Sequence, residues 1–153
     1  MFQQQKLFND SNSSELQIQV FFDGACQPIN PGGIACYSFI IKNEDNTIHR
    51  GYGLAAYDST NNVAEYTALI KSLEWLLAKH YENVNILIRG DSLLVINQVK
   101  RRYEVYAPNI IPLYHKAIFL ISKFQHIEFE WISRGQNKEA DKLTCRAYEE
   151  HHT

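Results

Sequence analysis

The sequence contains few cysteines: only Cys26, Cys36 and Cys145 occur in 153 residues. They are widely spaced and form no Cys-x-x-Cys pair, so the sequence carries no zinc-binding signature. A small, odd number of cysteines is also typical of proteins that fold in a reducing compartment without a disulfide framework. We therefore expect free thiols and an intracellular, cytoplasmic protein.

The sequence also lacks long apolar runs and any excess of positive charge. No stretch approaches the roughly 20 apolar residues that a transmembrane helix needs, and the first eight residues lack the apolar core of a signal peptide. The net charge is -2, from 15 Lys and Arg against 17 Asp and Glu. Proteins that hold nucleic acid by bulk positive charge are usually strongly basic. We expect a soluble protein without membrane association, in which any basic contact is local.

The length of 153 residues corresponds to one domain with a complete hydrophobic core. Residues 1–15 end in a run of Asn, Asp and Ser, which are polar and turn-forming, so we expect a flexible N-terminal tail. Residues 16–150 are predicted to form a single domain, and we expect a monomer.

Apolar alternation, helical periodicity and turn residues predict the elements of an α/β fold. Strands are expected over residues 16–22, 34–42, 47–55, 84–88 and 126–132. Helices are expected over residues 63–79, 92 to about 100, 110–124 and 138–149. The first three strands are joined by short turns and should pair antiparallel, whereas strands separated by helices should pair in parallel. The predicted fold class is α/β, with a five-stranded mixed sheet flanked by helices.

Four carboxylates occur where such a fold can bring them to one edge of the sheet. Asp23 and Asp91 each follow a predicted strand, and Glu65 and Asp141 fall in the first turns of two predicted helices. In open α/β sheets, ligands collect outside the carboxyl ends of the strands. Each carboxylate also has a simpler explanation, because Asp-Gly is a common turn, Asp91 can cap a helix, and acidic residues favour a helix N-terminus.

Taken together, four neighbouring carboxylates would destabilise the fold without cations, because like charges raise each other's pKa. A set of carboxylate oxygens, with no His or Cys at ligand spacing, favours Mg²⁺ or Mn²⁺. Two such ions, about 3.5–4 Å apart, can activate a water molecule and stabilise the leaving oxygen of a phosphodiester. The pattern therefore predicts a metal-dependent phosphodiester hydrolase.

Four motifs together resemble type 1 ribonuclease H, particularly its compact prokaryotic form. They are Phe22-Asp-Gly-Ala-Cys26 with Asn30-Pro-Gly-Gly33, Ser59-Thr-Asn-Asn-Val-Ala-Glu-Tyr66, Gly90-Asp-Ser92, and Trp131-Ile-Ser-Arg-Gly-Gln-Asn-Lys-Glu-Ala-Asp141. The similarity extends from residue 17 to about residue 149. It implies a ribonuclease H-like fold and hydrolysis of the RNA strand of an RNA–DNA hybrid, leaving a 3′-hydroxyl and a 5′-phosphate.

The resemblance also implies roles for individual residues. The catalytic, metal-binding residues would be Asp23, Glu65, Asp91 and Asp141, holding two Mg²⁺ or Mn²⁺ ions with Asp23 bridging. The implied substrate-binding residues are Gly24, Cys26, Asn30, Gly33, Asn61, Asn62, Ser92 and Arg134. The Asn and Ser side chains would contact the minor groove, where 2′-hydroxyls distinguish RNA from DNA. Helix capping explains Asn61 and Asn62 equally well, and Arg134 fits either a phosphate contact or a solvated side chain.

The sequence departs from the family pattern in two places. Many members carry a histidine in the loop after the fifth strand, but residues 133–136 contain none, and Arg134 is the only ionisable side chain there. We expect a lower rate of the same reaction. Longer members carry a basic protrusion after the central helix, where this chain has only Lys100-Arg-Arg-Tyr103 and Tyr106. This cluster fits a DNA contact or a solvated helix end, and few phosphate contacts predict weak, salt-sensitive binding.

Other functions fit parts of the pattern. Double-stranded RNA offers a similar A-form minor groove, so it is a second candidate substrate. A non-catalytic hybrid-binding module of the same fold is an alternative, although clustered acidic residues would weaken binding to phosphates. An exonuclease or integrase of this fold would require differently spaced acidic residues.

Overall fold

The computed structural model describes residues 16–152, so the tail predicted at residues 1–15 lies outside the described residues. The elements that position the site are, in chain order, β2 (Gln17–Gln27), β3 (Gly33–Asn43), β4 (Asn46–Ser59), α1 (Asn61–Ala78), β5 (Asn85–Gly90), α2 (Leu93–Val99), α3 (Ile111–Ile121), β6 (His126–Trp131), the short 3₁₀ helix η2 (Arg134–Gln136) and α4 (Lys138–His151).

The strands form one mixed sheet in the order β4-β3-β2-β5-β6. β3 pairs antiparallel with both β2 and β4, whereas β5 pairs parallel with both β2 and β6. Short turns join the antiparallel strands, whereas the connections between parallel strands contain helices. Parallel strands require such long crossovers because the chain must return to the same end of the sheet. The predicted α/β class and five-stranded mixed sheet are therefore confirmed.

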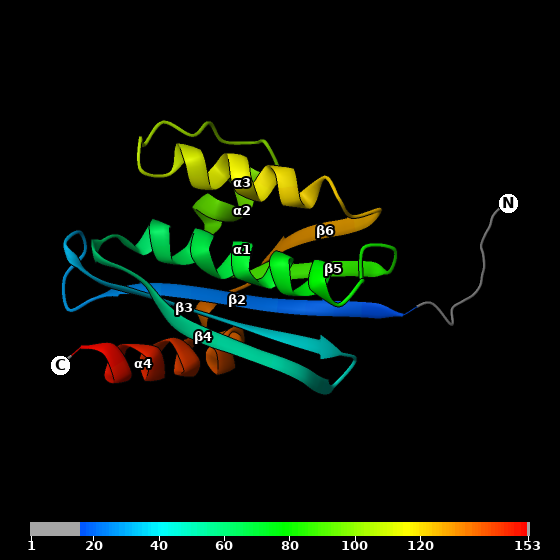
Figure 1. The fold of residues 1–153 in the computed structure, drawn as a ribbon, viewed down its shortest axis with the longest axis horizontal. Coiled ribbons are helices and arrows are strands. Elements are labelled where there is room, and N and C mark those ends of the chain that lie inside the picture. Colours follow the sequence, from blue (N-terminus) through cyan, green and yellow to red (C-terminus); the bar gives the residue numbers. More distant parts are fainter. Residues whose placement is uncertain (1–15, 153) are drawn as a thin grey trace, which may run out of the picture.

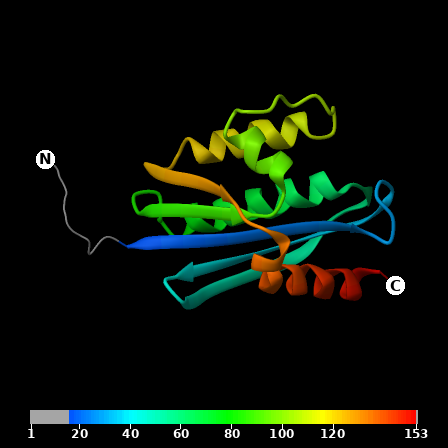
Figure 2. The same ribbon diagram turned by 180° about the vertical axis from the view of Figure 1, so that it is seen from behind.

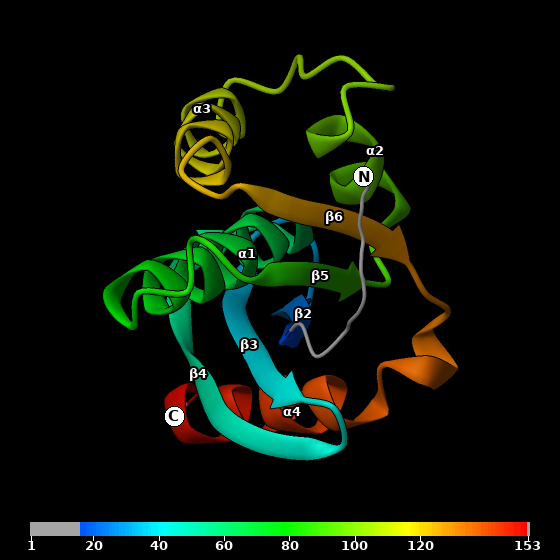
Figure 3. The same ribbon diagram turned by 90° about the vertical axis from the view of Figure 1, so that its right-hand side faces the viewer.

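The helices cover the two faces of the sheet unequally. α1, α2 and α3 lie on one face, while α4 crosses the other face beneath β3 and β4 (Figures 1 and 3). The largest core lies between α1 and the sheet, where Val20, Phe22, Ile88, Leu69 and Leu73 are fully buried. These residues alternate along the strands and recur at helical spacing in α1, which is why the sequence pattern predicted both elements. Within residues 16–152 no helix is long and apolar enough to span a bilayer.

β2 is longer than the sequence predicted. The expected end at Phe22 and Asp23 was wrong, because the antiparallel pairing with β3 continues through Asp23, which lies opposite Ser38, as far as Gln27. The parallel pairing with β5 does stop here, since its last pair is Phe22 with Gly90. Asp23 is therefore a mid-strand residue that lies at the point where its parallel neighbour ends.

The start of α1 packs directly against the backbone of β2. A Cβ atom at Gly24 would overlap the carbonyl carbon of Ala64 and the amide nitrogen of Glu65, so only glycine permits this approach. The helix begins at Asn61, two residues earlier than predicted, because the Thr60 side chain caps it by accepting a hydrogen bond from the amide of Val63. This contact brings the first turns of α1 to the edge at which β5 ends.

Candidate active site

Three carboxylates meet where β2, β5 and α1 come together. Asp23 lies in β2, Glu65 in the second turn of α1, and Asp91 directly after β5. One carboxylate oxygen from each lies within 4.8 Å of the others. Asp23 and Glu65 are only 5% and 7% exposed, respectively. The fold therefore assembles three of the four predicted metal ligands in a largely buried cluster.

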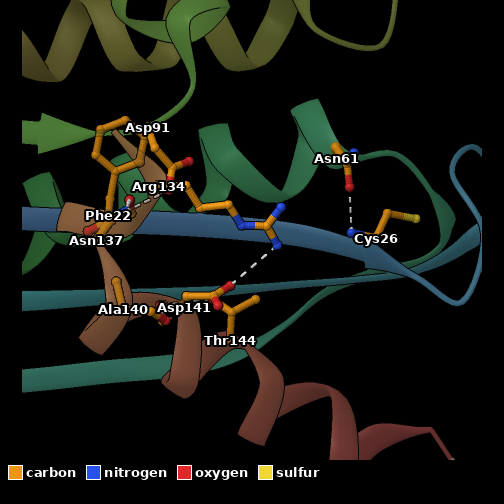
Figure 4. A network of polar contacts seen from close by, with 10 residues as sticks. Phe22, Cys26, Asn61, Asp91, Arg134, Asn137, Ala140, Asp141 and Thr144 are labelled. Carbon is orange, nitrogen blue, oxygen red and sulfur yellow. Dashed lines mark hydrogen bonds and ion pairs between the residues drawn. The ribbon is translucent and has the colours of Figure 1, made fainter. Parts of the chain in front are cut away.

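The fourth predicted ligand, Asp141, approaches from the other face of the sheet. The chain leaves β6, passes through η2 and enters α4 (Figure 2), which places Asp141 in the first turn of that helix. Asp141 lies outside the cluster of three, and its Oδ1 is 3.8 Å from Nη2 of Arg134 (Figure 4). Because the Arg134 side chain is 82% exposed, this ion pair is a weak one.

Burial is the largest cause that raises the pKa of each clustered carboxyl group, and neighbouring negative charges add to it. The pKa of Asp23 rises to about 7, that of Glu65 rises well above its ordinary value, and that of Asp91 is also raised. The positive charge of Arg134 lowers all three pKa values. Near neutral pH, a bound cation would favour the ionised cluster.

Two oxygens of the cluster have no hydrogen-bond partner within the described part of the chain. They are Oδ2 of Asp23 and Oε1 of Glu65, and both are buried. Buried polar atoms normally form hydrogen bonds, so two buried carboxylate oxygens without a partner suggest a ligand from outside the chain. Mg²⁺ and Mn²⁺ prefer carboxylate oxygen as a ligand. The residues present therefore fit a divalent cation.

Asn137 supports the cluster, although its sequence context did not predict a role in the site. It is 2% exposed, and its Nδ2 donates hydrogen bonds to the backbone oxygen of Phe22, at 2.9 Å, and to Oδ2 of Asp91, at 3.3 Å (Figure 4). The residue lies inside the matching motif, but its type and position suggested only a turn. Its partner Phe22 is 115 residues away in the sequence, so the contact could not be predicted from local pattern.

Two hydroxyl groups anchor α4 to the sheet beside Asp23. The Ser38 hydroxyl donates to the backbone oxygen of Ala140 at 2.6 Å, and it lies 2.8 Å from Oγ1 of Thr144. The Thr144 side chain also forms a hydrogen bond with Asp23, which partly offsets the effect of burial on the pKa of that carboxyl group. Ser38 interrupts an otherwise apolar stretch of β3, and this interruption was the sequence signal that could have drawn attention to it.

The predicted substrate contacts Asn30 and Asn61 connect the loop after β2 to α1. Oδ1 of Asn30 accepts a hydrogen bond from the backbone amide of Asn61 at 2.9 Å. Oδ1 of Asn61 accepts one from the backbone amide of Cys26 at 2.7 Å (Figure 4), so Asn61 does not cap its own helix. In this state the Cys26 amide is engaged by Asn61 and would become available to substrate only if that bond opened.

The remaining predicted contacts lie around the same edge. Gly33 packs so closely on the preceding loop that a Cβ atom would overlap the backbone oxygen of Ile29, and the Gly24 amide bonds to the Glu65 carboxylate. Ser92 caps α2, since its side chain accepts a hydrogen bond from the Val95 amide at 3.2 Å. The other two residues, Asn62 and Arg134, are partly and largely exposed.

Comparison with known proteins identifies the family. A family model described as reverse transcriptase-like matches residues 21–147. The N-terminal RNase H domain of Rv2228c from Mycobacterium tuberculosis shares 30% identity with this chain, at a TM-score of 0.80, covering 88% of this chain and 95% of that one. The chain belongs to the type 1 ribonuclease H family. The resemblance inferred from the four sequence motifs is therefore confirmed.

Other members support the same assignment. A ribonuclease HI from Halobacterium salinarum is 30% identical over 134 residues, which cover 88% of this chain and 65% of that protein. The structure of LC11-RNase H1 in complex with an RNA/DNA hybrid matches with a TM-score of 0.82 and 28% identity, covering 89% of this chain and 99% of that one. The chain spans 31% of the length of the curated bifunctional protein Rv2228c, to which it is 33% identical over 114 residues.

Proposed function

We propose that this protein is an endoribonuclease that hydrolyses the RNA strand of RNA–DNA hybrids, leaving 5′-phosphate and 3′-hydroxyl ends. The observation that carries the proposal is the cluster of Asp23, Glu65 and Asp91, whose ligand oxygens lie within 4.8 Å of one another. Two of those residues are buried, and each has a carboxylate oxygen without a hydrogen-bond partner in the described part of the chain. This arrangement would be costly in a protein that only binds nucleic acid. The hybrid bound to LC11-RNase H1 supports the substrate class.

Asp23, Glu65 and Asp91 would hold two Mg²⁺ or Mn²⁺ ions, with Asp141 contributing from α4. When bound, such ions activate water for attack on the phosphodiester and stabilise the leaving oxygen. The protein's own part is to hold the carboxylates in place. Asn137 donates to Asp91, and Thr144 bonds to Asp23, so both aspartates are fixed by side chains of the segment that carries Asp141.

The hybrid would lie across the N-terminal ends of α1 and α2 and the loop after β2. The hydrogen bond between Asn30 and the Asn61 amide makes this loop and α1 one continuous surface beside the carboxylates. We assign minor-groove contacts to the side chains of Asn30, Asn61, Asn62 and Ser92, and backbone contacts to Gly24, Cys26 and Gly33. Double-stranded RNA presents the same type of groove and is the second substrate to test.

Arg134 would contact a phosphate of the RNA strand near the carboxylates. Its guanidinium is largely exposed and lies 3.8 Å from Asp141, so it can reach substrate without breaking a strong ion pair. Arginine also suits phosphate geometry, because its planar fork can donate two parallel hydrogen bonds. It occupies the loop in which many family members carry a histidine.

The proposal is tested with three labelled duplexes of one sequence, RNA–DNA, RNA–RNA and DNA–DNA, each with Mg²⁺, Mn²⁺ or chelator. We expect metal-dependent cleavage of the RNA strand of the hybrid. Asp91→Asn should reduce the rate by more than about 100-fold, because it removes a metal ligand. The matched control is Asp45→Asn, which changes an exposed aspartate in the turn between β3 and β4.

Two outcomes would contradict the proposal. If Asp91→Asn cleaved the hybrid at the wild-type rate, Asp91 would not be a metal ligand. Binding of the hybrid without cleavage, by folded protein in either metal, would support the non-catalytic hybrid-binding module instead. Cleavage of RNA–RNA in addition to the hybrid would widen the substrate class and leave the site unchanged.

A further inference from the structure

Asn137 contacts all three chain segments that bring aspartates to the site. Its Nδ2 donates to the backbone oxygen of Phe22, the residue before Asp23, and to the carboxylate of Asp91. Its backbone oxygen accepts a hydrogen bond from the amide of Asp141 at 3.0 Å. One side chain and one peptide unit therefore link β2, the end of β5 and the first turn of α4.

The position of Asn137 would ordinarily lead its side chain to a different partner. It is the N-cap residue of α4, and asparagine at that position usually accepts a hydrogen bond from an amide of the first turn, which stabilises a helix by about 1 kcal/mol. Here the side chain makes no capping hydrogen bond. Its Oδ1 is buried and has no hydrogen-bond partner among residues 16–152, which costs roughly 1–3 kcal/mol. Stability of α4 alone therefore does not explain the residue.

The orientation of the amide is fixed by its surroundings. Both neighbours of Nδ2, the Phe22 carbonyl and the Asp91 carboxylate, accept hydrogen bonds, and a flipped amide would place Oδ1 against two acceptors. Both N–H groups of the amide are thereby used. The Asp91 carboxylate is held at a set distance from the backbone of β2, on which Asp23 lies.

We propose that Asn137 is a positioning residue that holds Asp91 in register with Asp23 and Asp141 so that the three can share divalent cations. This inference rests on the proposed function, because it assigns Asn137 to the same metal-binding carboxylates. Removing a residue that donates a hydrogen bond to a metal ligand typically lowers metal affinity by about 10- to 100-fold. Asn137 binds neither ion nor substrate itself and acts through Asp91.

The test compares Asn137→Ala with Asn97→Ala. Asn97 is also a buried asparagine, at 8% exposure, and its Nδ2 donates to the Leu93 backbone oxygen at 3.0 Å without touching the carboxylates. Thermal unfolding is followed during titration with Mg²⁺, and the concentration that gives half of the maximal stabilisation reports metal affinity. Steady-state cleavage of the hybrid gives kcat and KM separately.

For Asn137→Ala, we expect the Mg²⁺ concentration that gives half-maximal stabilisation to be at least about 10-fold higher than for the wild-type protein. Its kcat at a fixed, subsaturating Mg²⁺ concentration should fall, while KM for the hybrid changes by less than about twofold, because the groove contacts lie elsewhere. Asn97→Ala should lose thermal stability without either change. As a second variant, Asn137→Ser retains one donor and is a good N-cap residue, so it should fold and show an intermediate Mg²⁺ requirement.

An unchanged Mg²⁺ midpoint in folded Asn137→Ala and Asn137→Ser would overturn the inference, as would an equal shift in Asn97→Ala. Failure of the proposed function gives a different result. In that case the wild-type protein would not cleave the hybrid at all, whereas the Mg²⁺ midpoints of the variants could still be compared by unfolding.

Discussion

Replacing Asp23 with asparagine should stabilise the metal-free protein while abolishing cleavage. The pKa of Asp23 is about 7 in the folded protein, against an ordinary value of 3.8, mainly because the carboxyl group is buried. The folded state therefore binds more protons than the unfolded state between these two values, and the free energy of unfolding falls as the pH rises through this range. Each tenfold difference between the dissociation constants is worth about 1.4 kcal/mol, so Asp23 alone lowers stability by roughly 4 kcal/mol between pH 4 and pH 8.

Asparagine has nearly the same shape and carries no charge. It can still accept the hydrogen bond from Thr144, and its amide group replaces the unpaired Oδ2 beside the unpaired Oε1 of Glu65. Asp23→Asn should therefore be more stable than the wild-type protein by up to about 4 kcal/mol at pH 8, and the difference should largely disappear at pH 4. Saturating Mg²⁺ should stabilise the wild-type protein and have little effect on the variant.

The assay is equilibrium unfolding in urea with chelator, at pH 4 and pH 8, for the wild-type protein, Asp23→Asn and the exposed control Asp45→Asn. The control should match the wild type at both pH values, since Asp45 lies in an exposed turn. The reasoning is refuted if Asp23→Asn is no more stable than the wild type at pH 8. It is equally refuted if the variant gains the same stability at both pH values, because the gain would then not come from ionisation.

Three further predictions concern the surroundings of the cluster. Gly24→Ala should lower the free energy of unfolding in urea by more than about 2 kcal/mol, because the added Cβ atom overlaps backbone atoms of α1. Gly135→Ala is the control and should have little effect, because its Cβ atom would lie 4.0 Å from Oγ of Ser133. Arg134→Ala should move the acidic limb of the pH–rate profile to higher pH, because Arg134 lowers the pKa of all three clustered carboxyl groups, and Arg134→Lys should largely restore it; an unmoved limb would contradict this assignment. Asn61→Ala should raise KM for the hybrid about tenfold with a smaller change in kcat, and a fall confined to kcat would argue against a groove contact.

The sequence predicted the elements whose pattern is local. The apolar run at residues 84–88 predicted a strand before Asp91, and the structure has β5 at Asn85–Gly90. Helical spacing after residue 60 placed Glu65 near the start of a long helix, and α1 begins at Asn61. In each case the apolar side chains that define the sequence pattern also form the core, so the local pattern is enough to predict the element.

The features that the sequence missed depend on pairs of segments. Asp-Gly at residues 23 and 24 is usually a turn, but β3 provides a continuous partner up to Gln27, and glycine is needed there for contact with α1. The hydrogen bonds of Asn61 and Asn137 likewise join residues 35 and 115 positions apart, respectively. From the sequence alone, an asparagine that bonds to a distant segment looks the same as one that caps the adjacent helix.

The C-terminal segment from Arg134 to Thr144 completes a site whose other acidic residues lie much earlier in the chain. Asp23 receives a hydrogen bond from Thr144, Asp91 receives one from Asn137, and Arg134 offsets part of the negative charge. Ser38 fastens this segment to β3 through the Ala140 carbonyl. Removing a hydrogen-bond partner from a charged group that is shielded from water destabilises the protein. We therefore expect the positions of the two aspartates and the docking of α4 to stabilise each other. Docking of α4 therefore does more than deliver Asp141, because the same segment also supplies the side chains that form hydrogen bonds with the buried Asp23 and the partly buried Asp91 before any cation binds.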